Sequence, residues 1–472
     1  MLKLAIASTA CILTSSAFGE IADAELRSRV TKAMRKGAVF YRSKVARHGG
    51  YVYHYSIDLK LRLGEGVATE DQIWVQPPGT PTVGMAYLRA YEATKDSYYL
   101  DAGREAAEAL VFGQLRGGGW TNAIDLKLRR TGAKYSGGPR RREGNCSLDD
   151  GQSQSAILML IRADEALGFK HREIHDATKF ALRSLLAAQF PNGGFPQVWR
   201  GPVKKQPIVK ASYPDYDWRT ENRVKNYWDY YTLNDNVCGY VLDTLLEAHR
   251  VYREDKYMAS ARRLGDFLLL ARMPEPQPAW AQQYNYEMKP IWARKFEPPA
   301  VSGDESQEVI ETLMKIFEAT GDSKYLEPVP RALAFLRKSL LPDGRLARYY
   351  ELKTNRPLYM ARKSRKVYKL TYDDSRLPGH YGWKNESRLD ELERAYSSLK
   401  SGRSSNKAMT SELNAEVQDI LKSLDSQGRW ISTYRGERLI GQAKFKLNTP
   451  YLASSVFSQN LETLSSYLMG PR

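Results

Sequence analysis

The sequence predicts an all-α protein whose helical hairpins form a ring, an α/α toroid. Four consecutive stretches repeat one order: an apolar helix, a short turn, an Ala/Leu-rich helix and a glycine-containing corner. Apolar residues recur at helical spacing, as in Leu264, Phe267 and Leu268. The chain also begins and ends with half a hairpin. The first and last helices can therefore pair and close a ring of six hairpins.

The complete repeats follow one another along the chain, over 84–120, 156–199, 237–284 and 309–350. Segments 391–400 and 415–430 predict a fifth pair. The last helix, about 452–468, has no partner after it, and the first helix, which leads to the Gly-Gly-Tyr corner at 49–51, has none before it. Two segments, 129–144 and 202–231, interrupt the pattern shortly before acidic corners, where we expect a cleft.

The N-terminus has the layout of a secretory signal peptide. A basic residue, Lys3, precedes the apolar run Leu4–Leu13, and small residues end at Gly19. We therefore expect a signal peptide over 1–19, one toroidal catalytic domain over 20–472, and a secreted or periplasmic protein. No later apolar run is long enough to span a membrane.

The composition favours a polyanionic partner. The formal net charge is +17, and the chain holds 30 tyrosines and 9 tryptophans, flat rings of the kind that often contact sugars or bases. Such a charge attracts nucleic acid, acidic polysaccharide or anionic membrane. Export argues against nucleic acid, so we expect an acidic polysaccharide as the partner. We also expect a monomer.

Two corners carry more acidic and amide groups than a helix start requires. One holds Asp149 and Asp150, and the next comparable corner holds Asn234, Asp235 and Asn236. Any one of these residues could simply cap a helix. Surplus oxygens on two equivalent corners instead indicate a hard cation such as Ca²⁺.

Several arginines follow in the third and fourth repeats. Arg294 lies in a rigid loop between a tryptophan and a Phe-Glu-Pro-Pro corner, and Arg348, Arg356 and Arg362 lie in one later segment. They could form a basic exposed hairpin. Alternatively, their guanidinium groups could bind carboxylates.

Four stretches together resemble polysaccharide lyase family 10, the pectate lyases with an α/α toroid. They read PNGGFPQVW, YYTLNDNV, WAQQYNYEMKPIWARKFEPPAVSGDES and ARYYELKTNRPLYMARK, and the resemblance covers about 84–385. The sequence LDDGQS stands where the family has an Asp-Asn-Gly-Ala-Thr type motif. Asp150 thus replaces the usual asparagine, and the 202–231 insert and the terminal helices are additions to the family pattern.

The resemblance implies a role for each candidate residue. Arg294 matches the catalytic base; Asp149, Asp150 and Asp235 match the calcium and substrate corners; Arg348 and Arg362 match substrate-binding arginines, and we place Arg356 with them. The implied reaction is β-elimination on polygalacturonate or pectin, in which Ca²⁺ and arginine neutralise the uronate carboxylate. Because a guanidinium is a weak base, an alkaline optimum is expected.

Two other functions fit the same residues. A glycoside hydrolase could use Asp149 and Asp235 as an acid/base pair without calcium. A secreted glycan-binding protein could keep the aromatic cleft without any catalysis.

The cysteines allow two interpretations. Cys146 precedes Asp149 by three residues, and Cys238 follows Asp235 by three. If the two aspartates share one ion, a disulfide could join the corners, since it needs Cα atoms within about 7 Å. Otherwise the thiols are buried separately, as small hydrophobic groups.

Overall fold

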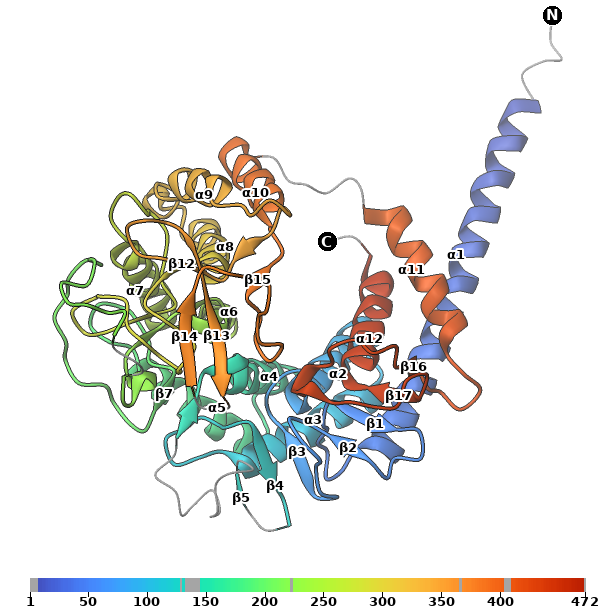
Figure 1. The fold of residues 1–472 in the computed structure, drawn as a ribbon. Helices are drawn as coiled ribbons and strands as arrows, with labels where there is room; N and C mark the ends of the chain where they lie inside the picture. The colour runs from blue at the N-terminus through green and yellow to red at the C-terminus, as the bar shows by residue number, and fades with distance from the viewer. Residues whose placement is uncertain are drawn as a thin grey trace, which may run out of the picture.

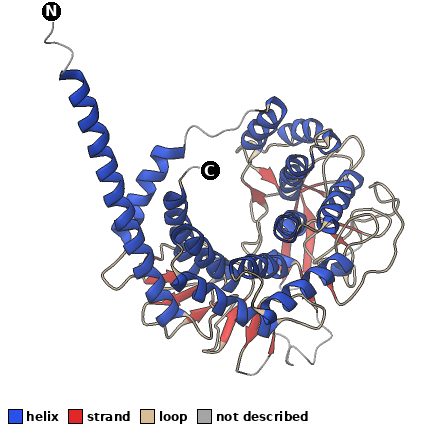
Figure 2. Cartoon of the chain, turned by 180° about the vertical axis from the view of Figure 1, so that it is seen from behind, coloured by secondary structure: helices blue, strands red, loops and turns tan. Residues whose placement is uncertain are grey.

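The computed structural model describes residues 7–127, 130–131, 145–220, 224–364, 367–402 and 409–470. Helices arranged around an open ring dominate it (Figures 1 and 2). The helices are α1 (Ala7–Phe40), α2 (Thr80–Thr94), α3 (Ser97–Gly113), α4 (Gln152–Ala166), α5 (Arg172–Ala187), α6 (Val237–Tyr252), α7 (Asp255–Ala271), α8 (Gly303–Thr320), α9 (Val329–Lys338), α10 (Leu389–Ser401), α11 (Met409–Ser423) and α12 (Ser454–Met469).

The helices form an inner and an outer series. Helices α12, α2, α4, α6, α8 and α10 contact one another in that order, and α3, α5, α7 and α9 pack outside them. Helix α1 contacts α2, α11 and α12. The predicted helical toroid and the predicted pairing of the first and last helices are therefore confirmed.

One predicted pair is divided between two parts of the ring. Helix α10 packs against α8 and α9, whereas α11 packs against α1 and α12. Leu389 and Leu392 of α10 belong to the large apolar core. Val417 and Ile420 of α11 belong to a second core shared with both ends of the chain. The two helices lie apart because each buries its apolar face in a different core (Figure 1).

Short strands join the ends of the hairpins. In each repeat, the strand before an inner helix pairs antiparallel with the strand after the following outer helix, as β6 does with β7, β8 with β9, and β10 with β12. This connection puts the N-termini of α4, α6 and α8 at the same end of the ring. The strands are β1 (His54–Ser56), β2 (Arg62–Leu63), β3 (Gln72–Trp74), β4 (Ala123–Asp125), β5 (Arg130–Thr131), β6 (Cys146–Ser147), β7 (Val198–Trp199), β8 (Tyr231–Thr232), β9 (Gln283–Tyr284), β10 (Val301–Ser302), β11 (Leu346–Ala347), β12 (Tyr349–Tyr350), β13 (Pro357–Ser364), β14 (Val367–Thr371), β15 (Lys384–Asn385), β16 (Ser432–Thr433) and β17 (Pro450–Ala453).

The N-terminal segment forms part of a long helix. Helix α1 runs from Ala7 to Phe40, through most of the proposed signal peptide. Within the described residues, no helix has the length and apolar character needed to cross a membrane. Cleavage near Gly19 and export remain predictions. Most of the interrupting segment 129–144 lies outside the described residues.

Candidate active site

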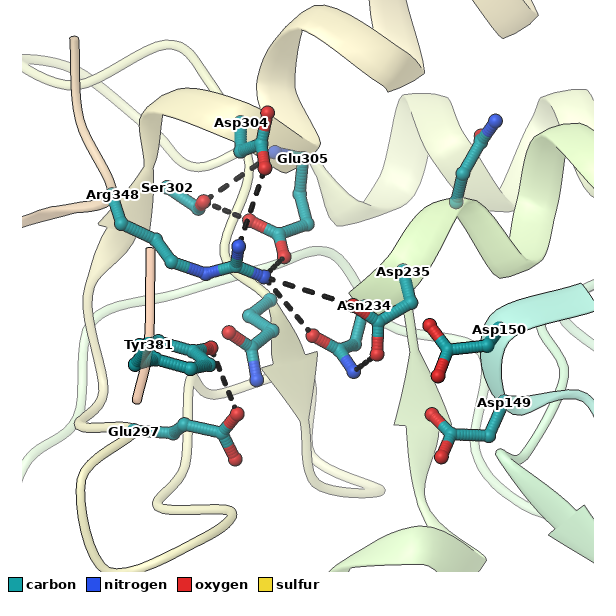
Figure 3. A network of polar contacts seen from close by, with 12 residues as sticks. Asp149, Asp150, Asn234, Asp235, Glu297, Ser302, Asp304, Glu305, Arg348 and Tyr381 are labelled. Atoms are coloured by element: carbon teal, nitrogen blue, oxygen red, sulfur yellow. Dashed lines mark hydrogen bonds and ion pairs between the residues drawn. The ribbon is translucent and has the colours of Figure 1, made fainter. Parts of the chain in front are cut away.

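Two acidic corners have the same backbone form. The 3-10 turns Asp149–Gly151 and Asn234–Asn236 each link a short strand to an inner helix. Asp150 has φ 47° and Asp235 has φ 52°, a left-handed conformation that aspartate and asparagine tolerate better than most residues. Because the two corners are neighbours at one end of the ring, their carboxylates face each other (Figure 3).

The three predicted metal-ligating aspartates come together in this cluster. Gln197 donates a hydrogen bond to Asp149 at 2.5 Å, and Gln76 donates one to Asp150 at 3.0 Å. The two turns that carry Asp149 and Asp235 contact each other. The opposed corners therefore concentrate negative charge at one point.

Burial and mutual repulsion raise the pKa of all three carboxyl groups. The pKa of Asp149 rises to about 6 through burial and the charge of Asp150. The pKa of Asp150 rises to about 7 through burial and the charge of Asp235. The pKa of Asp235 rises to about 7 through burial and the charge of Asp149. A cation at this cluster would relieve the repulsion.

The donor atoms fit calcium in type, but the protein alone does not complete a cage. Carboxylate and amide oxygens are the ligands that calcium takes. Among the described residues, however, no three His, Cys, Asp or Glu side chains are arranged to hold one ion. Further oxygens from water or substrate would be needed, so calcium remains a proposal.

Arg348 lies beside this cluster and is largely buried. Its guanidinium donates to Glu305 at 2.7 Å, and to Asp304 and Asn234 at 3.3 Å each (Figure 3). It also lies over the ring of Tyr381, 4.8 Å from the centroid. Burial by itself would lower the pKa of Arg348, but the nearby carboxylates, Glu305 first, hold it well above its usual value. Arg348 is therefore a fixed positive charge next to the aspartates.

Arg294 is held by Glu297. Its Nε donates to a Glu297 oxygen at 2.7 Å, and its backbone nitrogen donates to the other oxygen at 2.8 Å. The guanidinium lies over Phe296 and Tyr381, 5.3 Å and 5.6 Å from the ring centroids, and its side chain remains 42% exposed. Arg294 thus keeps an open side while its orientation is fixed.

Two opposing effects set the charge of Arg294. Burial by itself would lower its pKa, but Glu297 outweighs burial and holds the pKa of Arg294 well above its usual value. The guanidinium is therefore charged at rest.

The 202–231 insert supports the loop that carries Arg294. Trp218, in the insert, is buried, and its carbonyl accepts a hydrogen bond from the indole of Trp292 at 2.7 Å. Ser212 donates from its backbone to Met288 at 3.1 Å. The insert therefore packs against the Arg294 loop from outside.

The two remaining predicted arginines lie away from the acidic cluster. Arg362 is exposed on β13. Burial lowers the pKa of His380, and the charges of Arg362 and Arg294 lower it further. Arg356 stacks over Tyr372 at 3.6 Å. Arg362 is thus placed near the side of the site that holds Arg294, whereas Arg356 belongs to a separate group with Tyr372.

The sequence analysis did not identify the residues that position the predicted site residues. Glu297 is buried, and Tyr381 donates to it at 2.9 Å. The carboxylate three residues after Arg294 was a usable signal. By contrast, Tyr381 and Gln76 are far from the site in sequence, and no local pattern marks them.

A cavity opens beside the aspartates. It has a volume of about 420 Å³, and Asp150, Asp235, Tyr240 and Glu308 are among the residues that line it. Tyr240 is 42% exposed there. Such a ring beside a charged cleft can contact a sugar face.

The cysteines are separate thiols. Cys146 accepts a hydrogen bond from the backbone of Gly119, and Cys238 donates to the carbonyl of Thr232. The disulfide hypothesis is therefore wrong, and the alternative of two buried thiols is confirmed. Each sulfur faces its own part of the core.

Comparison with known proteins agrees with the sequence motifs. Residues 114–343 match the protein family described as pectic acid lyase. This match confirms the predicted resemblance to a polysaccharide lyase family. The pectic acid lyase region contains the acidic corners and Arg294, whereas Arg348, Arg356 and Arg362 lie beyond its end. No curated protein sequence matches significantly.

Solved structures with similar arrangements are distant in sequence. A family 10 polysaccharide lyase from Cellvibrio cellulosa is 20% identical, with 68% of this chain and 97% of that chain covered and a TM-score of 0.47. A variant of a family 10 polysaccharide lyase from the same organism, in complex with trigalacturonic acid, is 19% identical, with 68% and 96% covered and a TM-score of 0.47. A cellobiose 2-epimerase from Bacillus thermoamylovorans is 14% identical, with 92% and 98% covered and a TM-score of 0.46.

Proposed function

We propose that this chain is a secreted pectate lyase that cleaves polygalacturonate by β-elimination, assisted by calcium. The observation that carries the proposal is the placement of Asp149, Asp150 and Asp235 beside the cavity, next to the buried cation Arg348. A uronate carboxylate entering this cavity needs positive charge, which Arg348 supplies from one side.

The acidic cluster would hold the ion. Asp149, Asp150 and Asp235 would provide its protein oxygens, and the substrate carboxylate would provide another. When bound, calcium would withdraw charge from that carboxylate and make the neighbouring C5 proton more acidic. The aspartates also keep their side chains ordered through Gln197 and Gln76.

Arg294 would take the C5 proton. As the proton leaves, its bonding electrons form the C4–C5 double bond and the bond from C4 to the glycosidic oxygen breaks. The leaving oxygen then takes a proton from water. Since Glu297 keeps Arg294 charged at rest, the neutral guanidine is scarce at neutral pH. We therefore expect activity to rise into the alkaline range.

The hydrolase alternative fits this geometry less well. The two carboxyl groups of a hydrolase lie about 5 Å apart or more, so that a sugar or water fits between them. Asp149 and Asp235 instead belong to one crowded acidic cluster with Asp150, in which each carboxyl group raises the pKa of a neighbour.

The decisive experiment measures the ultraviolet absorbance of the unsaturated uronide. Purified protein is incubated with polygalacturonate in calcium, in magnesium and in chelator. We expect product in calcium and strong loss in chelator. Saturated reducing sugars without absorbance would indicate the hydrolase, and binding without either product would indicate the glycan-binding protein.

A further inference from the structure

The cleft continues into a second, larger cavity that both chain ends build. It has a volume of about 770 Å³, and it shares Gln76, Asp150 and Ile440 with the cavity beside the aspartates. Its other walls are the segments 63–67 and 438–444. Both segments lie outside the pectic acid lyase region, so this cavity is an addition made by the rest of the chain.

The two segments are held against each other. Gly441 has φ 70°, and a Cβ there would lie 2.4 Å from the carbonyl oxygen of Gly64, so the two backbones are in direct contact. His54 contacts the carbonyl oxygen of Ile440 at 3.2 Å. Leu439 is buried in a small core with Tyr434 and Tyr451. The 438–444 segment is therefore fixed over the end of the acidic cluster.

Two cations line this cavity beside the carboxylates of Glu65 and Asp150, and neither cation has an acidic partner among the described residues. Arg438 donates only to the carbonyl of His380, at 3.4 Å, and Lys444 has no ion pair within the part of the chain that the structure describes. Both side chains are exposed. By contrast, Arg345 is paired with Asp343 at 2.7 Å. Unpaired cations in a cavity can accept carboxylates from a ligand.

Arg438 also connects the cavity to the Arg294 loop. The ring of His380, whose carbonyl it contacts, packs against Phe296 with centroids 5.1 Å apart. Phe296 in turn lies under the guanidinium of Arg294. A polymer crossing the aspartates can therefore continue past Arg438.

We propose that the cavity lined by 63–67 and 438–444 is an additional binding site for uronate units of the substrate, with Arg438 and Lys444 binding their carboxylates. The inference rests on the proposed function and deepens it: the enzyme would favour long polyuronate chains over short oligomers. Val67 and Ile440, which are 75% and 49% exposed, give the same cavity apolar contacts for sugar rings.

The test compares Arg438→Ala and Lys444→Ala with two matched controls. Arg435→Ala removes an arginine of the same loop that donates instead to Asn448, and Lys446→Ala removes a nearby lysine that does not line the cavity. Initial rates are measured on trigalacturonate and on polygalacturonate. Equal melting temperatures establish that all four variants fold.

We expect each cavity variant to lower kcat/KM on polygalacturonate about fivefold, the size of effect given by a solvent-exposed ion pair, mainly through KM. The loss on trigalacturonate should be smaller, so the ratio of long-chain to short-chain activity falls. Added salt should reduce the difference from wild type by screening. The controls should retain the wild-type ratio.

Calorimetric titration with a long galacturonate oligomer separates this inference from the proposed function. If the wild type binds the oligomer but forms no unsaturated product, the lyase proposal fails, while weaker binding by the cavity variants still supports the site. If the wild type is an active lyase and both cavity variants keep its chain-length ratio and oligomer affinity, the cavity is not a substrate site.

Discussion

Glu297 binds the guanidinium of Arg294 through Nε and Nη2 and also binds its backbone nitrogen. This contact fixes the direction of the guanidinium and also its charge. Tyr381 donates to the same carboxylate and stacks against both Arg294 and Arg348. The proposed base and the proposed carboxylate-binding arginine are thus positioned by one buried network.

Replacing Arg294 tests the base assignment. Arg294→Ala and Arg294→Lys should lower kcat by about 10²–10⁴-fold, the usual contribution of a positioned base, while affinity for galacturonate oligomers changes far less. Initial rates and calorimetry measure the two effects. Arg345→Ala, which removes an exposed arginine paired with Asp343, serves as the control. Wild-type turnover in Arg294→Ala would show that another group removes the proton.

Replacing Glu297 tests how the charge of Arg294 is set. The carboxylate holds the pKa of Arg294 up, so Glu297→Gln should lower that pKa and move the rising alkaline limb of kcat/KM to lower pH. The pH–rate profile measures the shift. Tyr381→Phe keeps the carboxylate and removes only one hydrogen bond to it, so its profile should stay near the wild type. If Glu297→Gln leaves the alkaline limb of the pH–rate profile at the wild-type pH, the ionisation of Arg294 does not determine that limb.

Replacing Asp150 tests the repulsion between the acidic corners. Burial raises its pKa to about 7, so the folded protein binds more protons than the unfolded chain between about pH 4 and 7. Stability in chelator should therefore fall as pH rises through this range. Asp150→Asn keeps an oxygen for Gln76 and removes the charge, so it should raise the melting temperature by about 1–3 °C at pH 8, with little change at pH 4.

With calcium bound, the wild type should have a higher melting temperature than Asp150→Asn, the reverse of the order expected in chelator. The wild type gains more from the ion than Asp150→Asn does, because a carboxylate is the stronger ligand. Melting curves at pH 8 with and without calcium measure this. An equal gain in both proteins would place the ion elsewhere.

Much of the fold was predictable because the repeat is local. Helical spacing of apolar residues and a glycine at each corner recur within every hairpin, so the toroid follows from short stretches. The separation of α10 from α11 was not predictable in this way. It depends on which core takes Leu389 and which takes Val417, and that choice involves residues from both chain ends.

The site was predictable only in part. The aspartates and Arg294 stand in recognisable corners, and the fold brings the aspartates together. Of the partners that fix them, Glu297 lies three residues after Arg294, whereas Gln76 and Tyr381 come from separate segments and take their roles from packing. The effect of Glu297 on the pKa of Arg294 appears only once the loop is folded.

The corners of the repeat offer a direct test of the fold. Gly193 and Gly344 occupy equivalent positions after α5 and α9, and each donates a turn hydrogen bond to the residue three before it. Both have positive φ, 95° and 80°. An alanine at either position therefore suffers similar backbone strain, about 1 kcal/mol.

The surroundings of the two glycines differ. A Cβ on Gly193 would lie 1.8 Å from the carbonyl oxygen of Arg263 in α7, whereas a Cβ on Gly344 would meet nothing within 4 Å. Gly193→Ala should therefore cost about 3 kcal/mol or more, since the backbone of the next hairpin must move, and Gly344→Ala should cost only the strain. Denaturant unfolding measures both. If the two variants lose similar free energy of unfolding, the close approach of the neighbouring hairpin does not add to the cost at Gly193. The positive φ alone would then explain why glycine is needed there.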